Sequence, residues 1–387
     1  MRKILLSLLI LSAALTASAQ SFTFNHGPYL QDPAEDGMSV FFTTSDRAFS
    51  WVEVRKDDGT DLGRFVTCRD GLLDAYTTTH AIRIDGLQPA TTYSYRLVSK
   101  QMTSFKPYSI TYGDSIATPW YSFRTLDPKA RRVTFLVVND GHNDAGKLRT
   151  LLQAFPLDSV DMVFYNGDMI SYYDNPATPY DGFLDVSTEL FAKHKPFVYV
   201  RGNHETRGSL ARHYHTLVGT PGSRFYRTLR VGNTALVLFD TGEDKPDDTP
   251  VYGGINDFDG YRTQQAEWFR TQVMKDRAFR RARHKIVLMH IPPVVTPGIP
   301  AGEEHGNVQL HRELAPLFSK AGIDLTLCGH THHHYHYAAG EENCGFPVYI
   351  NDNHSALLVT VADDGITVRC INDKGEEQPT QHYGKEE

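Results

Sequence analysis

The chain has few cysteines, no excess of positive charge and no apolar run long enough to cross a bilayer. Four cysteines among 387 residues are too few for a disulfide scaffold. The formal net charge of -7 at pH 7 argues against nonspecific attraction to nucleic acid or anionic lipid. The apolar run at residues 4–15 is far shorter than the roughly 20 residues that span a membrane. The composition, 40% hydrophobic and 22% charged, therefore indicates an ordinary soluble globular protein.

The N-terminus has the pattern of a secretory signal peptide. Arg2 and Lys3 precede the apolar run, and the small residues 17–19 follow it. We expect residues 1–19 to be a signal peptide cleaved after Ala19, which predicts a secreted or periplasmic protein. An uncleaved anchor is the alternative, and the shortness of the run disfavours it. Gln20 stands where a lipoprotein would have cysteine, so no lipid anchor is indicated.

An exported chain is free to form disulfides, and four cysteines allow three complete pairings. Cys344 and Cys370 both fall in the C-terminal strand region, so they are the pair that we expect first. Cys328 lies in an apolar run and is predicted to be a buried free thiol.

Residues 21–126 have the apolar alternation of β-strands. Val52 and Val54 alternate with Glu53 and Arg55, for example, and turn signals separate the runs. The predicted strands include residues 38–43, 50–56, 80–84, 92–99 and 121–124. Roughly seven short strands in about 100 residues predict an all-β sandwich. The polar, proline-containing segment 126–132 marks the expected domain boundary.

Residues 130–372 predict an α/β domain, because apolar strands alternate there with helical patterns. The expected strands are residues 133–138, 162–165, 197–200, 235–239, 286–289, 323–327, 347–350, 356–362 and 366–370. The expected helices lie near residues 148–155, 183–194, 263–277 and 308–321. The polar tail, residues 373–387, is expected to be frayed.

Polar side chains directly follow five of these strands. They are Asp140 and His142 after the first, Asp168 after the second, Asn203, His204 and Glu205 after the third, His290 after the fifth, and His330 and His332 after the sixth. In open α/β sheets, ligands bind beyond the carboxyl ends of the strands, so these side chains can converge. Carboxylate, imidazole and amide groups suit zinc, manganese or iron, and seven ligands are too many for one catalytic ion. The pattern therefore predicts two metal ions.

Each motif alone also has a plain structural explanation as a turn, a helix cap or a surface histidine. His333, His334 and His336, which follow the last pair, are predicted to be such surface residues. The order of the whole set, each motif after its own strand, favours a functional site.

The full set resembles the signature of the calcineurin-like metallophosphoesterases over roughly residues 130–340. The resemblance implies a four-layer α/β/β/α sandwich. Residues 27–31 and the corner at residues 86–95 resemble the fibronectin type III-like domain that precedes the catalytic domain of purple acid phosphatases. That domain is expected to pack against the catalytic domain and to border its cleft.

The resemblance also implies roles for the site residues. Asp140, His142 and His332 would bind the first metal, Asn203, His290 and His330 the second, and Asp168 would bridge both. His204 would face the substrate and assist the leaving group. Purple acid phosphatases, which this chain resembles, have the sequence aspartate-x-glycine at the first motif. They also have a tyrosine ligand three residues after the bridging aspartate. Here His142 and Ser171 occupy these positions, which implies a colourless protein without an iron–tyrosinate centre.

The predicted activity is hydrolysis of a small-molecule phosphate ester by a metal-bridging hydroxide. His204, oriented by Glu205 or another carboxylate, would protonate the departing alkoxide. Arg201, Arg207 and Arg212 are candidates to hold the phosphate, and the loops 172–185 and 243–262 would shape the pocket. A phosphomonoesterase is favoured. A phosphodiesterase, a nucleotidase or a binding protein with a relic catalytic domain are the alternatives, and the metal identities and oligomeric state stay open.

Overall fold

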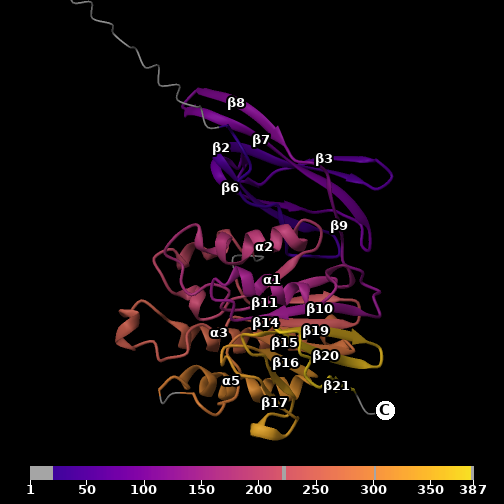
Figure 1. Ribbon diagram of the computed structural model, residues 1–387, viewed down its shortest axis with the longest axis vertical. Helices are drawn as coiled ribbons and strands as arrows, with labels where there is room; N and C mark the ends of the chain where they lie inside the picture. Colours follow the sequence, from indigo (N-terminus) through magenta and orange to yellow (C-terminus); the bar gives the residue numbers. More distant parts are fainter. Residues whose placement is uncertain (1–20, 220–223, 300–301, 385–387) are drawn as a thin grey trace, which may run out of the picture.

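An antiparallel β-sandwich is stacked on an α/β domain that contains two mixed sheets (Figure 1). The computed structural model describes residues 21–219, 224–299 and 302–384, so the predicted signal peptide lies outside the described residues. No helix of these three segments has the length and the apolar character needed to cross a membrane.

One long strand organises the sandwich. This strand, β2 (Met38–Lys56), pairs through its first half with β1 (Tyr29–Gln31) and β6 (Ala75–Ile84). Its second half pairs with β3 (Asp61–Phe65) and β7 (Thr92–Lys106). The last two strands, β8 (Ser109–Ala117) and β9 (Tyr121–Arg124), pair with β7. Residues 38–43 and 50–56, predicted as two strands, are thus one strand whose pairing shifts register after Thr43.

The alternating apolar residues of these strands form a single core. It joins side chains from both halves of β2, such as Val40 and Val52, with Ile82 of β6 and Leu97 of β7. A small hairpin of β4 (Cys68–Arg69) and β5 (Leu72–Leu73) lies apart from this sheet. The predicted all-β N-terminal region is confirmed.

The α/β domain contains two six-stranded sheets. The first has the order β12 (Phe197–Val200), β11 (Met162–Asn166), β10 (Val133–Val138), β19 (Ser355–Ala362), β20 (Gly365–Asn372) and β21 (Gln381–Tyr383). The second has the order β13 (Arg227–Val231), β14 (Thr234–Phe239), β15 (His284–Met289), β16 (Leu325–Cys328), β18 (Val348–Ile350) and β17 (Tyr335–Tyr337). The strands β10 to β12 are parallel, as are β14, β15, β16 and β18.

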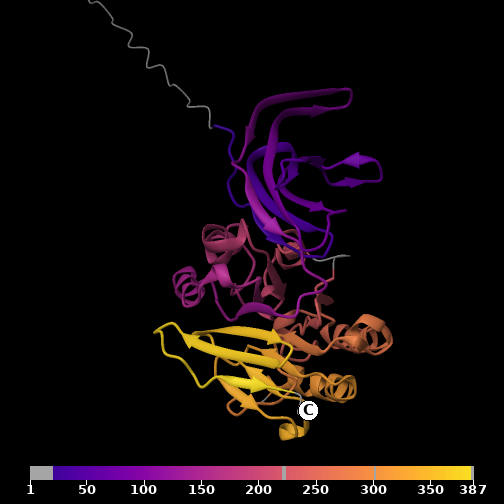
Figure 2. The same ribbon diagram turned by 90° about the vertical axis from the view of Figure 1, so that its right-hand side faces the viewer.

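Helices cover the outer face of each sheet, and an apolar core fills the space between the sheets. The helix α1 (Ala145–Gln153) and a helical run of η2 (Tyr180–Leu184), α2 (Asp185–Ser187) and η3 (Thr188–Ala192) lie over the first sheet. The helices α3 (Phe258–Thr271), α4 (Arg277–Arg281) and α5 (His305–Ala321) lie over the second (Figure 2). The predicted four-layer α/β/β/α fold is confirmed.

Local sequence signals set the helix ends. The carboxylate of Asp144 accepts the backbone N–H of Lys147 at 2.8 Å and so caps α1. Gly322, with φ of 67°, ends α5 in the left-handed conformation that glycine adopts without steric cost. The predicted helix near residues 183–194 begins earlier, at Tyr180, and contains two π-helical segments.

The sandwich packs on the helical layer of the first sheet. Tyr29 and Gln31 of β1 donate to the carbonyl of Leu217 at 3.1 and 2.8 Å, and Tyr95 donates to that of Lys193 at 2.9 Å. The rings of Tyr29 and Phe197 stack with centroids 5.8 Å apart. Residues 27–31, singled out in the sequence, therefore attach the two regions to each other.

Two expectations about the C-terminal region are wrong. The tail is not frayed throughout, because Gln381–Tyr383 forms β21 and pairs with residues 366–368 of β20. Cys344 and Cys370 do not pair, since all four cysteines are free. Cys344 packs under the outer helices and Cys370 packs between the sheets, so the second sheet separates them. Cys328 is buried, as predicted.

Candidate metal centre and active site

The predicted site residues converge at the carboxyl ends of parallel strands from both sheets. Asp140 and His142 follow β10, Asp168 follows β11, Asn203 and His204 follow β12, His290 follows β15, and His330 and His332 follow β16. Histidine and aspartate atoms from all five strand ends form three overlapping groups, each with its atoms within 4.8 Å of one another. The groups are Asp140, His142 and His332, then His142, Asp168 and His204, and finally Asp168, His290 and His330.

The backbone turns sharply at these side chains. Asp140, His142, Asp168, His330 and His332 have φ values of 52°, 46°, 56°, 75° and 56°. A residue other than glycine rarely adopts this left-handed conformation, which costs roughly 1–2 kcal/mol. Five such residues in one cluster indicate strain that the surrounding structure maintains for a function.

Glycines allow the strand ends to approach one another closely. A Cβ at Gly167 would lie 2.3 Å from Nδ1 of His290, and one at Gly202 would lie 2.2 Å from Oδ1 of Asp168. Both distances are too short for real atoms. The glycine preceding each motif therefore keeps space for the side chain of another motif.

The first group is built around the buried carboxylate of Asp140. Its Oδ2 accepts from Nδ2 of Asn139 at 2.6 Å and from the backbone N–H of His330 at 2.9 Å. Its Oδ1 is buried and has no hydrogen-bond partner among the described residues. Nε2 of His332 lies 3.3 Å from this Oδ1, and Nε2 of His142 lies 3.8 Å from it.

The second group is built around Asp168 and His290, which are also buried. Nδ1 of His290 donates to the carbonyl of Asn166 at 2.7 Å, which directs Nε2 toward Asp168 Oδ2, 3.0 Å away. Such a bond to a backbone carbonyl fixes the tautomer of a metal-binding histidine. Oδ1 of Asn203 lies 3.1 Å from Nδ1 of His330.

These groups fit metal ions. The oxygen of the Asn203 amide lies 3.2 Å from Asp168 Oδ2 and 3.3 Å from His290 Nε2. Turning the amide over would place its nitrogen there and let its oxygen accept from Arg207 Nη2 at 2.9 Å. With the oxygen inward, Asn203, Asp168 and His290 point possible ligand atoms at one another. Cations at the two ligand groups would satisfy the lone pairs of these atoms and the unpaired Oδ1 of Asp140.

Burial and charge set the protonation of the histidines. Burial lowers the pKa of His142 and of His330 to about 4, so both imidazoles are neutral at pH 7. Burial also disfavours the charged form of His290, but the carboxylates of Asp168 and Asp140 raise its pKa to about 10. Burial raises the pKa of Asp168, but His290 together with His204 and His330 more than offsets this, so the net shift is downward. Neutral imidazole and ionised carboxylate are the forms that bind metal, so His142, His330 and Asp168 are ready to bind, whereas His290 would release its proton when a metal binds.

Glu205 does not orient His204, contrary to expectation. Its buried carboxylate accepts the backbone N–H groups of Asp168 at 2.9 Å and Gly202 at 2.8 Å, and the hydroxyl of Tyr199 at 2.8 Å. Burial raises its pKa to about 7. Glu205 thus braces the two turns that carry Asp168 and Asn203. His204 is oriented by a carbonyl instead, because its Nδ1 donates to Ser171 at 2.8 Å.

Only one of the three candidate arginines lies at the site. Arg207 lines the cavity beside His204. Arg201 points away and pairs with the buried Asp240 at 2.7 Å. Arg212 lies in a separate cavity and donates to the carbonyl of Ile255 at 3.4 Å. Periodicity does not predict the direction of a side chain beyond a strand end, where the chain turns.

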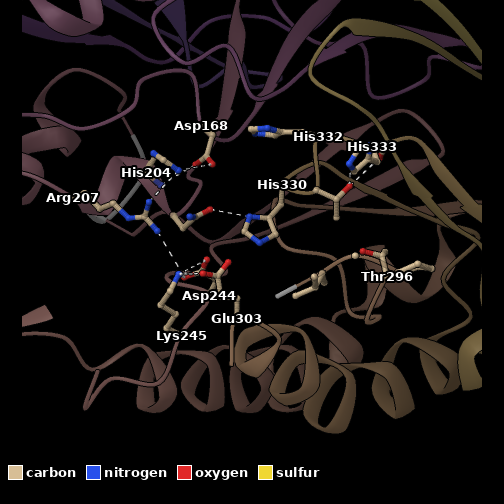
Figure 3. A pocket seen from close by; sticks show the side chains of 15 residues that line it. Asp168, His204, Arg207, Asp244, Lys245, Thr296, Glu303, His330, His332 and His333 are labelled. Carbon is tan, nitrogen blue, oxygen red and sulfur yellow. Dashed lines mark hydrogen bonds and ion pairs between the residues drawn. The ribbon is translucent and has the colours of Figure 1, made fainter. Parts of the chain in front are cut away.

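The ligand groups open into a cavity of about 320 Å³ (Figure 3). Two segments that follow β14 and β15 also line it, with Asp244, Lys245, Thr296 and Glu303. His333, which follows β16 and was predicted to be a plain surface residue, lines the cavity as well. Residues 172–185 do not line it, and no described residue of the sandwich does, so the sandwich does not border this cavity. The loop 243–262, which was expected to shape the pocket, contributes Asp244 and Lys245 to its lining. No sequence motif was expected directly at the end of β14. The same strand-end rule would have singled out residues 240–245, and Asn139 next to Asp140.

The family model for calcineurin-like phosphoesterases matches residues 133–334, just over half of the chain. The chain belongs to the calcineurin-like phosphoesterase family. It is a hydrolase of phosphoric ester bonds, and the clustered histidines and aspartates of this phosphoesterase are suited to a metal centre. Its catalytic domain implies a small-molecule substrate.

Solved structures with the same fold support the two-domain architecture. A purple acid phosphatase from yellow lupin (Lupinus luteus) seeds has a TM-score of 0.66 and 15% identity, covering 92% of this chain and 74% of its own. A structure of PhoD has a TM-score of 0.61 and 13% identity, covering 92% of this phosphoesterase and 88% of its own chain. No curated protein sequence matches the chain.

Proposed function

We propose that the protein is an exported phosphomonoesterase with two metal ions. Asp140, His142 and His332 would hold one ion, Asn203, His290 and His330 the other, and Asp168 would bridge them. The observation that carries the proposal is the position of Asp168, which belongs both to the ligand group of His142 and to that of His290 and His330. A carboxylate shared by two groups is what a pair of ions requires.

Two such ions, when bound, bring the pKa of a water toward neutrality and neutralise charge on the phosphoryl oxygens. The protein's own residues hold the substrate and supply a proton. Nδ1 of His204 is committed to the carbonyl of Ser171, so Nε2, which lies 3.9 Å from Asp168 Oδ2, faces the cavity. We assign to this Nε2 the transfer of a proton to the leaving oxygen.

The choice of a monoester rests on the cavity and on the fold. Arg207 and Lys245 line the cavity and offer N–H donors to the terminal oxygens of a phosphate. The similarity in fold to a purple acid phosphatase extends over 92% of the chain. Ser171 directs its carbonyl to His204, where the purple enzymes have a tyrosine ligand, so the metal-loaded protein should be colourless.

Hydrolysis of a panel of phosphate mono- and diesters by metal-loaded protein tests the activity. We expect turnover of monoesters to exceed that of diesters, and Asp168→Asn to abolish both. Equal activity of Asp168→Asn would rule out a centre bridged by Asp168. Faster turnover of diesters would instead identify a phosphodiesterase.

The assignment of His204 has its own test. General acid catalysis contributes typically 10²- to 10⁴-fold, and it matters most when the leaving group is poor. We expect His204→Ala to lose about this factor on alkyl phosphates and much less on an aryl phosphate with an acidic leaving group. Equal losses on both esters would exclude proton transfer to the leaving oxygen.

Export and the nature of the N-terminal domain are part of the same proposal. The signal-peptide pattern predicts a mature protein that begins at Gln20, which N-terminal sequencing of the exported protein would test. The sandwich would be a fibronectin type III-like domain that supports the helical layer of the first sheet through Tyr29 and Gln31.

A further inference from the structure

The guanidinium of Arg207 forms an ion pair with the carboxylate of Glu243, which has no assigned role in the proposed reaction. Glu243 follows β14, and its side chain is only 1% exposed. Its Oε1 accepts from Arg207 Nε at 3.0 Å, and its Oε2 accepts from Arg207 Nη2 at 2.8 Å. This two-bond fork fixes the plane of the guanidinium as well as its position.

Glu243 is itself held from several sides. Its Oε1 also accepts from Thr206 Oγ1 at 2.8 Å, and its Oε2 from the hydroxyl of Tyr252 at 3.1 Å. Its carbonyl accepts from Nη1 of Arg262 at 2.8 Å, and Arg262 is a buried residue of α3. A carboxylate fixed in this way holds Arg207 in one place in the cavity.

The fork leaves Nη1 of Arg207 as the edge that meets the reaction site. Nη1 lies 3.0 Å from Nε2 of His204, whose Nδ1 already donates to Ser171. The imidazole nitrogen therefore accepts from the guanidinium, which has no acceptor of its own. Figure 3 shows Arg207 between His204 and the pair of Asp244 and Lys245, pointing into the cavity.

We propose that Glu243 is a positioning residue that aims Arg207 at the phosphoryl oxygens, and that Arg207 exchanges His204 for such an oxygen when substrate binds. The inference rests on the proposed function and names the residues that recognise the phosphoryl group. A hydrogen bond from guanidinium to an anionic oxygen is stronger than one to a neutral imidazole, which favours the exchange. Once Arg207 no longer donates to it, Nε2 of His204 is free to take up a proton from solvent water, which it then passes to the leaving oxygen.

The test measures the affinity of metal-loaded protein for inorganic phosphate, by calorimetry and by competitive inhibition. We expect Arg207→Ala to weaken phosphate binding by about 10- to 100-fold, the range for hydrogen bonds to charged groups. Arg207→Lys keeps the charge but cannot form the fork, and it should lose nearly as much. Metal content should remain that of the wild type in both variants.

A double-mutant cycle isolates the role of Glu243. Glu243→Gln should weaken phosphate binding by about 10-fold alone and should have no further effect in the Arg207→Ala background. It should raise KM more than it lowers kcat, because a positioned donor binds substrate and transition state alike. Since Glu243 is buried, Tyr252→Phe serves as a milder second variant, with a smaller loss of affinity that likewise disappears without Arg207.

Arg149 and Glu189 provide a matched control. They also form a two-bond fork, from Nη1 and Nη2 of Arg149 to the two oxygens of Glu189 at 2.8 and 2.5 Å, on the exposed surface. Glu189→Gln should leave phosphate affinity unchanged. Equal effects of Glu243→Gln with and without Arg207, or an Arg207→Lys variant with normal affinity, would overturn this assignment alone. A metal-loaded wild type that neither hydrolyses esters nor binds phosphate would overturn the proposed function as well.

Discussion

His142 and His332 direct their Nε2 atoms at each other across 3.0 Å, although 190 positions separate them in the sequence. Both atoms also face the unpartnered Oδ1 of the buried Asp140. Since burial keeps the pKa of His142 near 4, its imidazole is neutral at pH 7. Two imidazole nitrogens and a carboxylate oxygen so arranged are suited to share one cation.

The variant His142→Ala tests this relationship. It removes one proposed ligand of the first group and leaves Asp168, His290 and His330 intact. We expect elemental analysis after dialysis to find one metal ion per chain instead of two, with turnover lowered by at least about 100-fold. His336→Ala, which removes an exposed histidine outside the three ligand groups, is the control. Two ions retained in His142→Ala would contradict the assignment.

Removal of the metal should destabilise the catalytic domain. Each ion present at 100 times its dissociation constant stabilises the folded state by about 2.7 kcal/mol. For a domain above 150 residues, 1 kcal/mol shifts Tm by about 2–4 °C, so two ions should raise it by roughly 10 °C or more. Scanning calorimetry with and without chelator measures the shift. Asp168→Asn should show a much smaller shift, and an equal one would place the stabilising metal elsewhere.

The strand-end motifs could be predicted because they depend on local rules. An apolar run predicts a buried strand, and a parallel sheet brings the ends of its strands to one edge, so Asp140 and Asp168, which follow adjacent strands of the first sheet, had to be neighbours. His290 joins them from the second sheet because the two sheets stack with these strand ends on the same side. The glycines at positions 167 and 202 marked the close approaches. Such features can be predicted from the order of the strands along the chain and from the spacing of their apolar residues.

The other features of the site depend on the directions in which side chains point beyond the strand ends. The alternation of apolar and polar residues in the sequence does not determine these directions. Arg201 and Arg207 are six positions apart beyond the same strand, yet one pairs with the buried Asp240 and the other enters the cavity. Glu243, a partner of Arg207, lies in a loop whose backbone is held by Arg262 of α3, which donates to the Glu243 carbonyl. Such contacts are tertiary, and the residues around them look like ordinary loop residues in the sequence.

Because all four cysteines are free, the number of reactive thiols can be predicted for the folded and for the unfolded protein. Cys68 is exposed, whereas Cys328, Cys344 and Cys370 are buried, and burial raises the pKa of Cys344 to about 11. We expect one thiol to react with a disulfide reagent in the folded protein and four to react after denaturation. Reducing agent should not change Tm. Fewer than four thiols in the unfolded, unreduced protein would show that a disulfide forms.

The C-terminal strand predicts a dependence of stability on the tail. The strand β21 pairs with β20, and Tyr383 packs against the core between the sheets. A chain that ends at Asn372 should lose about 1–3 kcal/mol of unfolding free energy, comparable to the burial of one large side chain. A chain that ends at Gly384 should match the full-length protein. Urea unfolding of both measures the difference, and identical curves would show that β21 contributes nothing.

His80 predicts how stability depends on pH in the sandwich. Burial lowers its pKa to about 4, and its Nε2 lies 3.0 Å from Thr44 Oγ1 and 3.3 Å from Ser50 Oγ. Between pH 6.5 and 4 the unfolded chain binds a proton that the folded chain does not, so stability falls as pH falls through this window. The loss reaches about 3 kcal/mol, at 1.36 kcal/mol per pKa unit. His80→Gln should remove this part of the acid sensitivity in urea titrations at several pH values, whereas His213→Gln, at an exposed position, should retain it. Parallel stability curves for wild type and His80→Gln would show that His80 is not the neutral, buried group that the fold requires.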